Sequence, residues 1–160
     1  MAVKQLGQEV KVWYDPEGSG YVMLDVTDNI TPLNPIKIEG QKLLPKSEYH
    51  CSLVAARKLA NDKISEQEII ELVRKFLVGK IIQFESLGKE LYVCRKGEEV
   101  TVIARAQIIG IEDLRREIRK FIPDYAPFPH VTLLQSENSR YGIGVNSPQK
   151  FAEYCQKLAP

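Results

Sequence analysis

Residues 50–53 read His-Cys-Ser-Leu, and residues 130–133 read His-Val-Thr-Leu. The chain has only two histidines, and in both places a small apolar residue, a hydroxyl residue and a leucine follow the histidine. Each of these two four-residue motifs, or words, His50–Leu53 and His130–Leu133, lies at the start of an apolar run that predicts a β-strand, at 49–55 and at 129–134. Side chains alternate between the two faces of a strand. Each word therefore predicts an imidazole and a hydroxyl on one face and two apolar side chains on the core face.

The predicted faces suggest one shared site. His50 and Ser52 lie on the same face of the first strand, and His130 and Thr132 on the same face of the second. Two such strands side by side would present two imidazoles and two hydroxyls to one groove. Since imidazole titrates near neutrality, one ring can accept a proton while the other donates one. Hydroxyls can donate hydrogen bonds to phosphate oxygens. These groups suit in-line cleavage of a phosphodiester without a metal.

The two words together resemble the paired H-x-[ST]-Φ motifs of the 2H phosphoesterase superfamily. That group includes RNA 2′,3′-cyclic phosphodiesterases (also called 2′-5′ RNA ligases), eukaryotic cyclic phosphodiesterases and phage enzymes that cut cyclic oligonucleotide signals. The separation of 80 residues between His50 and His130 is similar to the family pattern, as is the approach Pro127-Phe128-Pro129. The resemblance extends from about Leu43 to the C-terminus. It implies an α+β fold of two lobes with pseudo-twofold symmetry, antiparallel sheets flanked by helices, and a central cleft.

The resemblance also implies an activity. It predicts a metal-independent phosphodiesterase that acts on a nucleotide or RNA 3′-end, at a 2′,3′-cyclic phosphate or a 2′-5′ linkage, without a cofactor. His130 would activate water and His50 would protonate the leaving ribose oxygen, or the two roles would be exchanged. Ser52 and Thr132 would hold the phosphate, and serine at residue 52 is within the family pattern.

Aromatic side chains near the two words are candidates to stack on a base, as they do in proteins that bind single strands. For Tyr49 and Phe128, which flank the words, a stacking role and a core role remain equally open. Trp13, Tyr14 and Tyr125 are expected in the core.

Other functions remain open at this stage. The same scaffold could serve as a non-catalytic module that binds an RNA end or a nucleotide, as a phosphodiesterase of cyclic oligonucleotide signals, or as a ligase. A zinc site of both histidines with cysteines lacks any C-x-x-C or H-x-x-x-H spacing. Cys51 is adjacent to His50 and therefore points to the opposite face, so we expect a buried thiol and not a nucleophile.

Composition limits the partners. The chain of 160 residues is 44% apolar and 27% charged, which predicts one soluble globular domain over residues 1–160. Its net charge of +1 argues against duplex DNA as a partner. The three cysteines, an odd number at wide spacing, predict reduced thiols in a cytosolic protein. No apolar run is long enough for a membrane span and the N-terminus has no signal-peptide core, so we expect a cytoplasmic monomer without a membrane partner.

The remaining elements favour the α+β class. Ser65 and Glu68 predict a capping box at the start of a helix, and Asp15 to Gly20 predicts the turn of a hairpin. The expected helices are 65–77, 111–122 and 147–158. The expected strands are 9–14, 21–27, 36–38 and a three-stranded meander over 81–86, 91–95 and 100–104.

Overall fold

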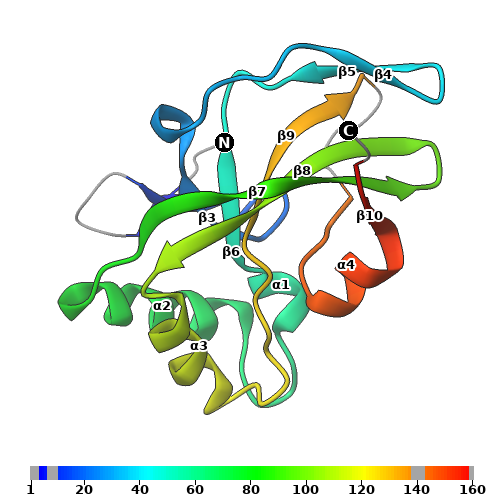
Figure 1. Ribbon diagram of the computed structural model, residues 1–160. Coiled ribbons are helices and arrows are strands. Elements are labelled where there is room, and N and C mark those ends of the chain that lie inside the picture. The colour runs from blue at the N-terminus through cyan, green and yellow to red at the C-terminus, as the bar shows by residue number, and fades with distance from the viewer. Residues whose placement is uncertain (1–3, 7–10, 138–142, 159–160) are drawn as a thin grey trace.

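The computed structural model describes residues 4–6, 11–137 and 143–158 as an α+β fold with an open, antiparallel sheet and a few helices (Figure 1). The strands are β1 (Lys4–Gln5), β2 (Val12–Tyr14), β3 (Val22–Asp25), β4 (Ile36–Ile38), β5 (Gln41–Pro45), β6 (His50–Val54), β7 (Gln83–Lys96), β8 (Glu99–Ile109), β9 (His130–Ser136) and β10 (Cys155–Lys157). The helices are α1 (Ala56–Leu59), α2 (Glu66–Gly79), α3 (Ile111–Arg119) and α4 (Pro148–Tyr154), with a 3-10 turn, η1, at Thr27–Asn29.

Within the described residues these ten strands form one sheet, eight of them in the order β1-β2-β3-β6-β9-β8-β7-β10, and all the pairings are antiparallel. Strand β9 lies in the middle. It pairs with β8 along one side, and with β6 and then β5 along the other. Strand β4 pairs only with β5. The two strands that begin with a histidine are therefore neighbours in the centre of the sheet.

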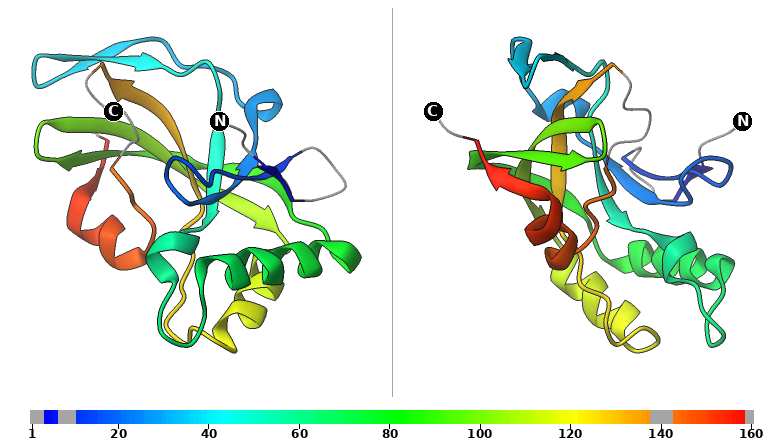
Figure 2. Two further views of the ribbon diagram at one scale, coloured as in Figure 1. Left: turned by 180° about the vertical axis from the view of Figure 1, so that it is seen from behind. Right: turned by 90° about the vertical axis from the view of Figure 1, so that its right-hand side faces the viewer.

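Helices α2 and α3 lie side by side and cover one face of the sheet (Figure 1). Ile69 of α2 and Leu114 of α3 pack in one buried cluster with Cys51 of β6 and Val131 of β9. Helix α4 packs elsewhere, where its Phe151 contacts a separate cluster that includes buried Ile103 of β8. Figure 2 shows α4 and α2 on different sides of the central strands. The core beneath the two histidine words is thus built by α2 and α3.

The start of α2 confirms the capping box. The Ser65 hydroxyl accepts a hydrogen bond from the Glu68 amide, and the Glu68 carboxylate accepts one from the Ser65 amide. Both bonds satisfy backbone donors that an uncapped helix would leave open. At 14 residues α2 is the longest helix described. No helix in the described part of the chain combines the length and apolarity needed to cross a membrane.

Several elements differ from the sequence prediction. The expected meander is a hairpin of two long strands, β7 and β8, because the chain passes Gly88 with a shift of register and stays paired. The last helix ends at Tyr154 and continues as β10, and α3 ends at Arg119. Strand β5 and the short helix α1 were not predicted. Residues 9 and 10 of the first expected strand lie outside the described residues.

The prediction of three reduced thiols is wrong for two cysteines. Cys94 of β7 and Cys155 of β10 form a disulfide across a sequence separation of 61 residues. The β7–β10 register places the two residues directly opposite each other, which brings their side chains together. Cys51 is free and buried. The cysteine spacing therefore no longer supports a cytosolic location.

Candidate active site

The pairing of β6 with β9 sets the geometry of the site. Cys51 lies opposite Val131 in an antiparallel register, and the exposed fraction of both residues is 0%. Leu53 and Leu133, two residues further along each strand, are buried as well. These four side chains form the inner face against α2 and α3. The predicted core face of both words is therefore confirmed.

The other face carries the four polar residues of the two words. Since Cys51 and Val131 are opposed, the antiparallel register places His50 beside Thr132 and Ser52 beside His130. His50 is exposed, whereas the other three side chains are half-buried. All four thus reach solvent from one face of two adjacent strands, as the sequence predicts.

His130 is held in a defined tautomer. Its Nδ1 lies 2.9 Å from the carbonyl oxygen of Phe128. Because a carbonyl oxygen only accepts, Nδ1 carries the proton, and the Nε2 atom of the neutral ring keeps a free lone pair. Burial lowers the pKa of His130, and this hydrogen bond opposes the effect. Near neutral pH the ring is therefore uncharged and can accept a proton at Nε2.

His50 has a different electrostatic environment. Its pKa is lowered to about 4 by desolvation of the ring and, to a smaller extent, by the positive charges of Lys46 and His130, while the carboxylate of Asp25 opposes the shift. Asp25 lies directly opposite His50 on β3. The free ring is therefore neutral near pH 7. The sequence-based expectation that imidazole titrates near neutrality needs correction for the unliganded protein, in which the pKa values of both rings are lowered from 6.5. A negative charge next to His50 would raise its pKa and make it a proton donor.

Cys51 does not belong to the chemistry of this face. Burial raises the pKa of its thiol to about 12, so it stays protonated near neutral pH. This agrees with the expectation of an inert, buried thiol.

The two proposed stacking residues are both buried. Tyr49 is 3% exposed, and by strand alternation it shares the inner face of Cys51. Phe128 is 5% exposed, and its ring stacks on Phe151 with 4.5 Å between the centroids. Neither ring offers a free face to a base in this conformation. The same alternation rule that placed Cys51 inward would have placed Tyr49 inward.

Trp13 is not in the core, contrary to the sequence expectation. Its neighbours Val12 and Tyr14 are buried, while Trp13 is half-buried on the alternate face of β2. Strand pairing places Trp13 opposite Met23, and Met23 opposite Ser52. A row of side chains therefore extends from the candidate site toward an indole, a group on which bases stack well.

Arg105 of β8 is a further residue that the sequence did not single out. It lies directly opposite His130 and is exposed. Its guanidinium carbon lies 5.0 Å from the ring centroid of Phe128 and 5.9 Å from that of Phe151. A permanent cation is thus held by aromatic rings next to the ring that can accept a proton. Only the β8–β9 register reveals it.

In the described ranges, no three histidine, cysteine, aspartate or glutamate side chains gather in a way that could hold a metal ion.

Comparison of the chain with protein-family models, with curated proteins and with solved structures gave no match. The resemblance to 2H phosphoesterases therefore remains a prediction from the sequence.

Proposed function

We propose that the protein is a metal-independent phosphodiesterase that hydrolyses a phosphodiester of a nucleotide or RNA end, at a 2′,3′-cyclic phosphate or a 2′-5′ linkage. One observation carries the proposal: the only two histidines of the chain share one face of adjacent strands with two hydroxyl residues. The two-lobed, pseudo-twofold architecture of the 2H superfamily is part of the same proposal.

In the proposed reaction, Nε2 of His130 removes a proton from a water molecule as its oxygen attacks phosphorus. The bond between phosphorus and one ribose oxygen breaks, and that oxygen takes a proton from His50. His130 ends protonated and His50 neutral, and exchange with solvent restores the starting state. The tautomer fixed by Phe128 supports His130 as the base, since the proton is on Nδ1 and the free lone pair is on Nε2.

The substrate itself would prepare the acid. A phosphate bound on the face that β6 and β9 share places negative charge beside His50, which raises its pKa from about 4 toward neutrality. Ser52 and Thr132 would donate hydrogen bonds to the non-bridging oxygens. Arg105, beside His130, would add a positive charge that favours the developing charge on phosphate. A module that only binds phosphate needs these donors but has no use for a proton acceptor such as His130.

A substrate panel in the presence of EDTA tests the proposal. It contains 2′,3′-cyclic mononucleotides, 2′-5′ oligonucleotides and cyclic dinucleotides, and we expect turnover of at least one of the first two classes. Turnover of cyclic dinucleotides alone would assign the enzyme to cyclic oligonucleotide signals. Binding of phosphate ligands without turnover would make it a binding module. Activity that EDTA removes and Mg²⁺ or Zn²⁺ restores would reject the metal-independent mechanism.

A further inference from the structure

A pocket of about 360 Å³ adjoins the candidate active site. Ser52 forms part of its wall, together with Lys58 of α1 and Lys150 of α4. Its volume is within the range of sites for small ligands, about 300–1,000 Å³. Because Ser52 belongs to both, a molecule whose phosphate lies between the two histidines can extend into this pocket.

The pocket is positively charged although the chain is nearly neutral. Its walls include Lys58, Lys96 and Lys150 against a single carboxylate, Asp124, while the whole chain has a net charge of +1. The ion pairs found among the described residues involve none of these three lysines. This concentration of positive charge favours an anionic occupant.

Aromatic side chains hold the three ammonium groups. Lys58 donates a hydrogen bond of 3.0 Å to the hydroxyl of Tyr21 and lies 5.4 Å from the centroid of that ring. Lys96 and Lys150 lie 5.4 and 5.5 Å from the ring centroid of Tyr154. Each ammonium has three donors and these contacts use few of them, so donors remain for a ligand.

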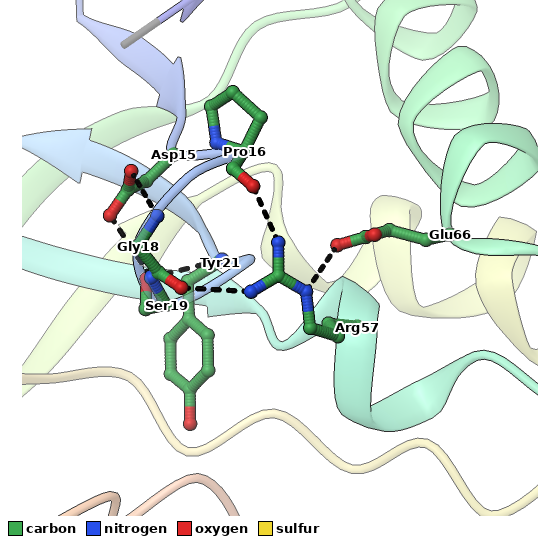
Figure 3. Close-up of polar contacts among 7 residues, drawn as sticks. All are labelled: Asp15, Pro16, Gly18, Ser19, Tyr21, Arg57 and Glu66. Atoms are coloured by element: carbon green, nitrogen blue, oxygen red, sulfur yellow. Dashed lines mark hydrogen bonds and ion pairs between the residues drawn. The ribbon is translucent and has the colours of Figure 1, made fainter. Parts of the chain in front are cut away.

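The loop before Tyr21 is fixed in place (Figure 3). Arg57 donates hydrogen bonds to the carbonyl oxygens of Pro16, at 2.6 Å, and Gly18, at 2.8 Å. It also forms an ion pair of 3.1 Å with Glu66 at the start of α2. The guanidinium thus ties the hairpin loop to two helices. The wall that carries Tyr21 is organised before any ligand arrives, which reduces the entropy cost of binding.

We infer that this pocket binds a second phosphate of the substrate, the one on the 5′ side of the reacting nucleotide; the inference rests on the proposed function. A 2′,3′-cyclic phosphate occupies both ribose hydroxyls, so the nucleotide can continue only through its 5′ oxygen. The preferred substrate is then the 3′-terminal nucleotide of an oligonucleotide, or a mononucleotide with a 5′-phosphate. A cyclic mononucleotide without a 5′-phosphate leaves the lysines unused.

Calorimetric binding of two probes tests the inference. The probes are a nucleoside 3′-phosphate and the matching nucleoside 3′,5′-bisphosphate. Wild type should bind the bisphosphate at least about 10-fold more tightly, the scale of one charge-assisted hydrogen bond. Lys58→Gln/Lys150→Gln should lose this preference and keep its affinity for the monophosphate. The control Lys42→Gln/Lys75→Gln removes the same charge from exposed positions outside the pocket and should keep the preference.

The single variant Lys58→Gln, with a smaller loss of preference, serves if the double variant does not fold. Equal affinity of wild type for both probes, or an unchanged preference in the folded pocket variants, overturns the inference. The measurement needs no turnover. A catalytically inactive protein that keeps the preference for the bisphosphate would therefore refute the phosphodiesterase and not the pocket.

A dinucleotide with a 3′-phosphate separates the two possible sources of the second phosphate, a strand and a terminal 5′-phosphate. Tighter binding than the bisphosphate assigns the pocket to the linking phosphate of a strand, and equal binding to a terminal 5′-phosphate.

Discussion

Strands β6 and β9 carry the same four-residue pattern, but their histidines have different surroundings. His130 is half-buried and its Nδ1 is tied to the carbonyl of Phe128. His50 is exposed, and the charges of Lys46 and Asp25 shift its pKa in opposite directions. The pattern therefore supplies two equivalent chemical groups, and the neighbouring strands and loops make them unequal. This inequality is what an acid and a base need, and each of the following experiments tests it.

The largest effect should come from removing either ring. His130→Gln and His50→Gln should each lower kcat/KM by about 10²–10⁴-fold, the usual scale for one positioned proton-transfer group. The two variants should differ with a nitrophenyl phosphodiester, whose leaving group needs no proton. His50→Gln should recover most of its activity on that substrate, and His130→Gln should not. The opposite result would exchange the two roles, and full activity of either variant would exclude a mechanism with two histidines.

Loss of a hydroxyl should have a smaller effect. Ser52→Ala and Thr132→Ala each remove one hydrogen bond to phosphate, of about 1.5–3 kcal/mol, and should lower kcat/KM by about 10- to 100-fold. Circular dichroism should show an unchanged fold. Ser86→Ala, an exposed hydroxyl on β7, is the matched control and should have wild-type kinetics. If both site variants keep wild-type kinetics, other groups hold the phosphate.

The pKa values of the two rings can be compared directly by NMR, since the chain has only two histidines. Both should titrate below 6.5, and His50 should respond to its neighbours. Lys46→Gln should raise the pKa of His50, whereas Asp25→Asn should lower it, and His130 should change less in both variants. Because kcat/KM reports the free enzyme, its pH optimum should lie below 6.5 and move in the same directions. A pH optimum of kcat/KM at or above neutrality would contradict the lowered pKa values of the two histidines in the free enzyme.

The smallest effect concerns stability. Both rings have a lower pKa in the folded chain than the reference value of 6.5 expected when unfolded, so the unfolded chain binds more protons as the pH falls. The free energy of unfolding should be unaffected by these groups above pH 6.5 and should decrease as the pH falls from there toward 4. Urea titrations at several pH values measure the decrease. The decrease in the free energy of unfolding with falling pH should be shallower in His50→Gln and in His130→Gln than in wild type. If both variants show the same slope as wild type, carboxylates alone cause the decrease.

Local sequence rules predicted the parts of the fold that depend on nearby residues. The capping box of Ser65 and Glu68 needs only one helical turn, and the inward position of Cys51 and Val131 follows from strand alternation. The candidate site was predicted for the same reason, because each word places its own histidine and hydroxyl on one face.

What the sequence missed depends on which strands are neighbours. Cys94 and Cys155 meet only because β10 adds to the edge of β7, and Arg105 joins the site only through its register with His130. Gly88 suggested the end of a strand, yet pairing with β8 carries β7 past it. In each case a contact between distant residues decided the outcome, and no local pattern records such a contact.

The central position of β9 has a consequence for native-state hydrogen exchange. Its amides are covered by β8 on one side and by β5 and β6 on the other. Edge strands fray and exchange by small local openings, whereas the amides of a strand enclosed in this way exchange only when several pairings separate together. His130 is thus attached to a segment that should be among the slowest to exchange with deuterium. Slow exchange there would mean that the geometry of the proton acceptor survives as long as the native state itself.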